Sequence, residues 1–438
     1  MSRPSHASQS LTASPVYLAA SAINSVIHAL PAGTAYFIGI VLITMFTGQL
    51  VHHQGSLARA ALPYVVHLRW GWHRVERAME RGKVALDALF ERAFAWCLER
   101  LPVEPVRLGS ERRTVHAIDS STVARLRANK QRGALWGKGY CHRAQRAVPA
   151  NIVAALTTVV LIRGTRVGVV RRTRFGTTCQ AAVAQVFADL PASSEKRLFS
   201  VDAGIATIEQ FRAATARDAL VGRLRKNVTL RRAPQPKRPG KRGRPARHGP
   251  VVHPGAKRPE GRPDEDTTIR IEEREVRVRR WGNLHFRETP QTQLDVVRVD
   301  DPAHKHPLLI GTTAHELTTE EIRIAYGHRW PVETNFYVAQ GTCAMEMPRA
   351  WSAPAVARRI SLALLAGSLL KAIAATCPPL PMGPWDRKAV SSAGRLANHL
   401  ALQAKTFVAL ALQGFAPRTY RIIPDPKETT ELQLPLAA

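Results

Sequence analysis

Residues 113–119 read Arg-Thr-Val-His-Ala-Ile-Asp (RTVHAID), and residues 197–202 read Arg-Leu-Phe-Ser-Val-Asp (RLFSVD). Each is a short apolar run, typical of a strand, that ends at an aspartate. Residues just past the ends of adjacent strands converge in a mixed α/β sheet, so we expect Asp119 and Asp202 to lie close together. Paired carboxylates supply the hard oxygen ligands that Mg²⁺ or Mn²⁺ prefers. Aspartate is also an ordinary turn residue, so this pattern alone leaves simple turns open.

The segments around these two runs predict the fold class. A long apolar run and a second strand follow the first aspartate, and helical apolar spacing comes before and after the second. The predicted strands are 113–118, 150–162, 166–172, 197–201 and 219–225, and the predicted helices are 178–190 and 208–215. The order is three strands, helix, strand, helix, strand, which indicates an α/β fold with a mixed sheet flanked by helices.

A third acid follows a helix signal. Residues 318–321 (TTEE) fit a capping box, which predicts a helix that runs through Tyr326. Because Pro331 is unfavourable inside a helix, we expect a kink or a new helix at that point. Arg329 and Glu333 are four residues apart and can share one helical face. An ordinary surface ion pair has the same spacing.

Tyr326, Arg329 and Glu333 match the Y-x2-R-x3-E part of the Y-R-E-K signature of bacterial insertion-sequence DDE transposases. The chain resembles this family over about residues 110–375. The resemblance implies a ribonuclease H-like catalytic core in which Asp119, Asp202 and Glu333 hold two Mg²⁺ ions, with Mn²⁺ as a substitute. It implies DNA strand cleavage and strand transfer as the activity. Arg329 and Tyr326 are then expected to orient Glu333 or to bind a nearby phosphate.

One position departs from the signature. The family places a lysine seven residues after the glutamate, and this chain has Gln340 there. Glutamine can contact DNA but cannot supply a cation to a phosphate, and a nearby cation such as Arg349 is a candidate substitute. The alternative function is therefore a catalytically impaired, transposase-derived DNA-binding protein.

The charge of the chain favours a nucleic-acid partner. There are 63 Lys and Arg residues against 33 Asp and Glu, a formal net charge of +30, and DNA is a polyanion that neutralises such an excess. The five cysteines form no C-x-x-C pair, which argues against disulfides and structural zinc and favours a cytoplasmic location near the nucleoid. The expected partners are transposon terminal inverted repeats and target DNA, bound by a homodimer, and no membrane partner is expected.

A basic insertion separates Asp202 from Glu333. Its Pro- and Gly-rich part is either a minor-groove arm or a solvated linker that touches phosphates. The period-two pattern of 268–280, continued by 284–286 and 293–299, predicts a β-rich remainder, and family resemblance suggests that the insertion contacts the transposon end. Trp281 is expected at a turn, where it either stacks on a flipped base or packs. The predicted DNA contacts are Arg238, Lys241, Arg242, Arg244, Arg247, Trp281 and Gln340.

The N-terminal region holds an apolar run at 34–51 that is nearly long enough to span a membrane. We expect a buried helix of an N-terminal bundle, docked on the amphipathic segment 82–101; a membrane span is the alternative. The predicted division is a helical domain at 1–105 that is a candidate DNA-binding domain, a catalytic core at 106–226 and 301–376, a basic linker and β-rich insertion at 227–300, and a C-terminal helix and tail at 377–438.

Overall fold

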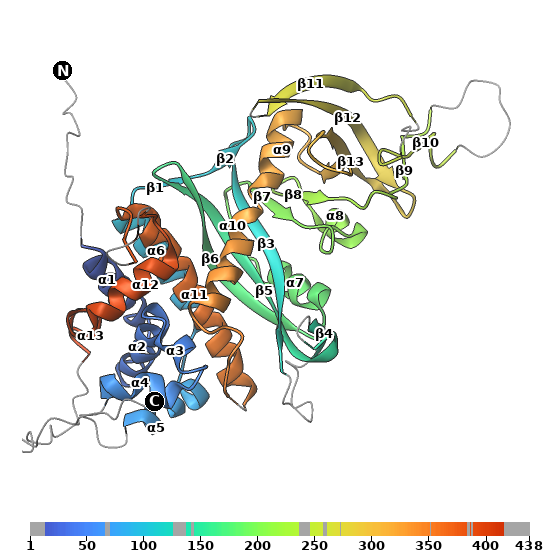
Figure 1. The fold of residues 1–438 in the computed structure, drawn as a ribbon. Coiled ribbons are helices and arrows are strands. Elements are labelled where there is room, and N and C mark those ends of the chain that lie inside the picture. The colour runs from blue at the N-terminus through green and yellow to red at the C-terminus, as the bar shows by residue number, and fades with distance from the viewer. Residues whose placement is uncertain are drawn as a thin grey trace, which may run out of the picture.

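Five strands rich in apolar residues form the centre of a mixed β-sheet. The computed structural model describes residues 14–65, 71–125, 137–141, 144–235, 246–256, 261–271, 273–350, 352–382, 386 and 389–415. The central strands are β3 (Arg113–Ala124), β5 (Arg146–Ile162), β6 (Thr165–Gly176), β7 (Arg197–Val201) and β8 (Asp218–Arg223). Together with the flanking helices they confirm the predicted α/β class (Figure 1).

The central strands lie side by side in the order β6-β5-β3-β7-β8. β5 is antiparallel to β6 and β3, whereas β7 is parallel to β3 and β8. A tight turn with Gly164 at φ 75° joins β5 to β6. The two parallel crossovers carry helices α7 (Cys179–Ala188) and α8 (Ile208–Ala213), as the sequence predicted.

The predicted end of the first strand at residue 118 is wrong. β3 continues to Ala124 because its antiparallel pairing with β5 does not stop, and Asp119 itself pairs with Ala155. What does stop at this point is the parallel pairing with β7, whose last pair is Ile118 with Val201. Asp119 therefore lies within a strand, at the point where one neighbouring strand ends.

The insertion is β-rich and extends the same sheet. β14 pairs with β8, and β13 and β12 follow it in the 14-stranded sheet. Its strands are β9 (Leu230–Arg231), β10 (Val251–Val252), β11 (Glu265–Ile271), β12 (Arg274–Phe286) and β13 (Thr289–Asp300), and β14 (Leu308–Thr312) follows the insertion and joins it to β8. The predicted turn after Trp281 is instead a bulge in β12, with Asn283 at φ 53° and its N–H bonded to the Asp295 carboxylate.

Helices cover both faces of the central sheet. Val115, Ala117 and Leu198 share one buried cluster with Val332 and Phe336 of α10. We call this side the α10 face. Ile118 and Phe199 point to the opposite side and share a second cluster with α7 and α8. The helices on the α10 face are α9 (Thr319–Gly327), α10 (Trp330–Gly341) and α11 (Ala353–Thr376).

The N-terminal helices gather with the C-terminal ones at one end of the molecule (Figure 1). They are α1 (Pro15–Ile27), α2 (Ala32–Phe46), α3 (Gln49–His52), α4 (Leu57–Val65), α5 (Gly71–Arg81), α6 (Leu86–Arg100), α12 (Ala393–Leu402) and α13 (Ala404–Ala411). Three short strands complete the sheet: β1 (Val103–Pro105), β2 (Arg107–Leu108) and β4 (Gly137–Cys141). A bidentate pair between Arg174 of β6 and Asp87 of α6 ties this bundle to the sheet.

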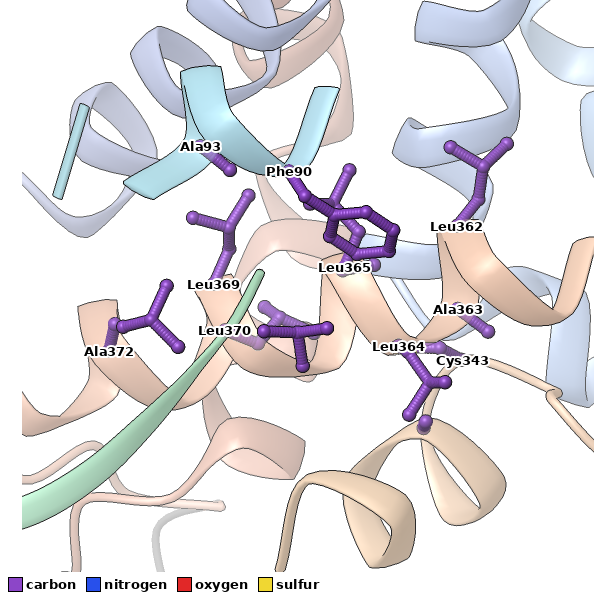
Figure 2. Close-up of a cluster of buried hydrophobic side chains, with 14 of the residues drawn as sticks. Phe90, Ala93, Cys343, Leu362, Ala363, Leu364, Leu365, Leu369, Leu370 and Ala372 are labelled. Carbon is purple, nitrogen blue, oxygen red and sulfur yellow. The ribbon is translucent and has the colours of Figure 1, made fainter. Parts of the chain in front are cut away.

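Residues 34–46 of the apolar run lie in the buried helix α2, as expected, whereas Gly48 at φ 68° interrupts the run and residues 49–51 belong to α3. The predicted packing partner of this helix was wrong. α2 packs mainly on α1, α5 and α11, whereas α6 packs on α1, α11 and β6. Figure 2 shows Phe90 of α6 among Leu365, Leu369 and Leu370 of α11. Of the described helices, α11 is long and apolar enough to cross a membrane, but most of it is buried inside the protein.

Candidate active site

Strand register brings the two aspartates together. Ile118 of β3 pairs with Val201 of β7, so Asp119 and Asp202 are the next residues along two neighbouring parallel strands. Adjacent strands lie about 4.8 Å apart. Asp119 has the same side-chain direction as Val115 and Ala117, because side chains alternate along a strand. Asp202 continues the series that begins at Leu198. Both carboxyl groups therefore lie on the α10 face, close enough for the charge of Asp202 to act on Asp119.

The third acid is placed by the junction between α9 and α10. Thr318 and Glu321 form a complete capping box that begins α9, which confirms the predicted helix start. Pro331 stands in the first turn of α10, where its missing N–H costs nothing, so the expected new helix begins there. Glu333 follows in the same turn and is half-buried.

α10 is fixed closely on the sheet. A Cβ atom added at Gly168 of β6 would lie 3.1 Å from Pro331 Cβ, so glycine permits the close approach of this helix. Buried Asn335 donates through Nδ2 to the Gly168 carbonyl over 2.9 Å. On the other side of α10, Lys371 of α11 donates through Nζ to the Pro331 carbonyl at 3.3 Å and also bonds to Thr334. The backbone that carries Glu333 is therefore held from two sides.

The predicted tyrosine and arginine lie between the acids. The Tyr326 hydroxyl donates to Asp202 Oδ1 at 3.3 Å, and burial raises the pKa of this tyrosine, so the hydroxyl stays protonated. Arg329 forms an ion pair with Glu333 through Nη1. Its guanidinium carbon lies 5.5 Å from the centre of the Tyr326 ring. The structure thus brings Asp119, Asp202, Tyr326, Arg329 and Glu333 to one place.

The Asp119 carboxyl group lies in surroundings that oppose its ionisation. Burial raises its pKa to about 6, and the charges of Glu333 and Asp202 act in the same direction. The Ser120 backbone N–H, which donates to Oδ1 at 2.8 Å, and the Arg329 charge oppose this shift. The ionised carboxylate is therefore costly here and calls for a further cation.

This cost predicts that Asp119→Asn stabilises the protein at neutral pH in the absence of divalent cations. Between pH about 4 and 6 the folded chain retains a proton that the unfolded chain has lost, so wild-type stability falls as pH rises through this interval. Asparagine has no such loss. We expect a gain of roughly 2–3 kcal/mol at pH 8 and none at pH 3.5, measured by thermal unfolding. Equal stability of both proteins at pH 8 would contradict the buried-charge explanation.

The three carboxylates are ligands of the type that a hard divalent cation binds, but in this structure they do not converge on one point. Three carboxylates on the α10 face supply oxygen ligands of the type that Mg²⁺ prefers. Within the described ranges, however, no group of three or more His, Cys, Asp or Glu side chains is close enough to hold one ion. The Arg329–Glu333 ion pair gives a physical reason, because it engages the third carboxylate.

Arg223 is a site residue that the sequence analysis missed. Val201 pairs with Gly222, so Arg223 continues the row of Asp119 and Asp202 onto the next parallel strand, and its charge acts on Tyr326. Arg223 and Tyr326 line a cavity of about 530 Å³ whose walls also hold Lys305, Arg323 and two histidines. The predicted strand 219–225 includes Arg223, but the observed strand β8 ends at this residue, two residues earlier than predicted. The cavity places positive charge next to Tyr326, whose hydroxyl bonds to Asp202.

The remaining predicted residues have different surroundings. Gln340 lies two turns after Glu333 and donates through Nε2 to Ser121 Oγ at 3.3 Å, so it faces β3 next to Asp119. Arg349 bonds to Gln54, a residue of the N-terminal bundle. Arg247 is exposed. The other four predicted basic contacts lie outside the described residues: Arg238, Lys241, Arg242 and Arg244.

Trp281 is not available for stacking on a base in this structure. Its side chain is completely buried, with 0% exposed, and its indole N–H donates to the Gly261 carbonyl at 3.0 Å. It packs among Leu284, Leu294 and Val296 of the insertion. The packed alternative is the arrangement observed.

No protein-family model matches this chain, and no curated protein matches it.

Proposed function

We propose that this protein is a DDE transposase that cleaves and joins DNA strands with the aid of divalent cations. The observation that carries the proposal is the meeting of Asp119, Asp202 and Glu333 on one face of the sheet, with Tyr326 and Arg329 between them. The three acids come from distant parts of the sequence, and the five residues match the catalytic pattern of bacterial insertion-sequence transposases.

The topology supports a ribonuclease H-like assignment for the core. Three antiparallel strands, β6, β5 and β3, are followed by the parallel strands β7 and β8, with helices in the two crossovers. In the family pattern the first acid lies on the first core strand along the chain and the second acid follows the fourth. Asp119 on β3 and Asp202 after β7 have these positions. The acid-bearing helix α10 then packs across the same face.

Asp119, Asp202 and Glu333 are the residues that would hold the metal ions. Two bound Mg²⁺ ions, or Mn²⁺ in their place, would supply activation of a water or 3′-hydroxyl and stabilisation of the leaving oxygen. To act as a ligand, the Asp119 carboxyl group must lose its proton. The Tyr326 hydroxyl holds the Asp202 carboxylate in orientation. Arg223, with Lys305 and Arg323, provides cations for the phosphates on either side of the cleaved bond.

The DNA partners follow from the same proposal. The net charge of +30 suits a protein that binds terminal inverted repeats and target DNA in the cytoplasm. A homodimer would pair the two transposon ends. The exposed Arg247 stands at the edge of the basic segment of the insertion, which supports a role for this segment in binding phosphates.

A second candidate is a transposase-derived protein that binds DNA without cutting it. The observation that favours it is Gln340, which bonds to Ser121 where the family signature has a lysine cation. The three acids are intact, which favours the catalytic proposal.

The test is metal-dependent cleavage of a duplex that carries the inverted repeats flanking the gene. We expect cleavage in Mg²⁺ or Mn²⁺, none in EDTA, and recovery when Mg²⁺ is added back, followed on a denaturing gel. Binding of the same duplex should persist in EDTA, because the arginines and lysines do not need the metal. Binding without cleavage in either metal would favour the second candidate.

A further inference from the structure

The carboxylate of Glu333 is already bound by the side chain of a nearby arginine. Arg329, one turn earlier, forms an ion pair with it through Nη1, and both side chains are partly shielded from water, with 14% and 31% exposed. The described part of the chain holds no cluster of three potential metal ligands, and this pairing engages the carboxylate that Asp119 and Asp202 would need as a third ligand. While Arg329 holds the Glu333 carboxylate, the candidate metal site therefore lacks its third carboxylate ligand.

Arg329 has the capacity to change partners. Its Nε atom is buried and has no hydrogen-bond partner among the described residues. Its charge acts on Asp119 and on Asp202 as well as on Glu333. A guanidinium binds phosphate through two parallel N–H donors, and Nε with a terminal nitrogen provides such a pair. A DNA phosphate on the Nε edge would satisfy the orphaned donor, and its negative charge would repel the Glu333 carboxylate bound at Nη1.

The backbone that carries Glu333 is held in place while its side chain changes partner. The helix backbone is fixed by Asn335 on Gly168 and by Gln340 on Ser121. Lys371 holds the first turn from the other side. When the guanidinium turns to a phosphate, the Glu333 carboxylate is free to turn toward the two aspartates while α10 stays in place.

We propose that Arg329 acts as a latch: its ion pair keeps the Glu333 carboxylate away from Asp119 and Asp202 in the free protein. A DNA phosphate that binds Arg329 releases this latch. This inference rests on the proposed function and adds a control to it. DNA binding and metal binding then favour each other by the same factor, because coupling between two ligands is reciprocal. Free protein is thereby kept from cutting DNA that does not occupy the site.

The test measures Mn²⁺ affinity of the full chain from the electron paramagnetic resonance signal of free Mn²⁺. Titrations are made with and without a 40-base-pair duplex, and the duplex alone serves as the blank. We expect the dissociation constant of wild-type protein to fall about tenfold when DNA is present, equivalent to about 1.4 kcal/mol. Arg329→Gln should bind Mn²⁺ about as tightly without DNA as wild-type protein does with it.

The control variant is Arg92→Gln, which removes an arginine–glutamate pair on α6, remote from the acids. It should show the wild-type affinities in both conditions. Equal Mn²⁺ affinity of wild-type protein with and without DNA would overturn the latch and leave the proposed function standing. Absence of Mn²⁺ binding even with DNA would overturn both. Should Arg329→Gln fail to fold by circular dichroism, the wild-type comparison still decides the question.

Discussion

Replacing Asp202 with asparagine is expected to lower the rate of metal-dependent DNA cleavage by at least about a thousandfold, or about 4 kcal/mol of activation free energy. Asparagine preserves the size of the side chain and its bond to Tyr326, but it removes the negative charge that holds a hard cation. Asp119→Asn and Glu333→Gln should show losses of the same order. Each variant should still retard the duplex in a gel-shift assay.

A matched control separates the loss of a ligand from the loss of a surface charge. Asp189 follows α7 on the opposite face of the sheet, where its carboxylate pairs with Arg174. Asp189→Asn removes the same charge and should leave the cleavage rate within about twofold of wild type, because surface ion pairs contribute little. Undiminished cleavage by any of the three site variants would remove that residue from the proposed catalytic set.

Replacing Trp281 with alanine is expected to lower the free energy of unfolding by about 3–5 kcal/mol in the absence of DNA. The indole is completely buried in the insertion and donates to the Gly261 carbonyl. Its removal leaves a large cavity and an unpaired carbonyl. Trp281→Phe should recover most of the packing but not the hydrogen bond. Urea denaturation monitored by circular dichroism measures the difference.

Trp330 provides the matched tryptophan, because 63% of its side chain is exposed. Trp330→Ala should change the free energy of unfolding by only about 0.5 kcal/mol. If Trp281→Ala were no less stable than Trp330→Ala but bound DNA more weakly, Trp281 would belong to the DNA-binding surface and not to the core.

Local signals in the sequence predicted the elements that carry the site. Thr318 and Glu321 satisfy each other's helix-end groups, so α9 could be located from four residues. Pro331 predicted the new helix, because proline fits a first turn and not an interior. The short apolar runs that end at Asp119 and Asp202 predicted the two strands that carry these acids. Each of these inferences depends on contacts between residues close together in the chain.

Features that depend on strand register or on packing could not be predicted from the sequence alone. Arg223 joins the site because Gly222 pairs with Val201, and pairing partners are not encoded in a single strand. β3 continues beyond Asp119 because β5 does, which is a property of the neighbouring strand. The bulge that buries Trp281 depends on the Asp295 carboxylate, which accepts from the Asn283 N–H across the sheet.

The proposed function requires that three carboxylates from distant parts of the sequence bind divalent cations together once DNA is bound. The most direct measurement is anomalous X-ray scattering from crystals of the protein with its terminal-repeat duplex and Mn²⁺. We predict manganese density within ligand distance of Asp119, Asp202 and Glu333, with Arg329 on a DNA phosphate. A DNA complex with no manganese at these carboxylates, or with manganese bound only elsewhere, would contradict the claim.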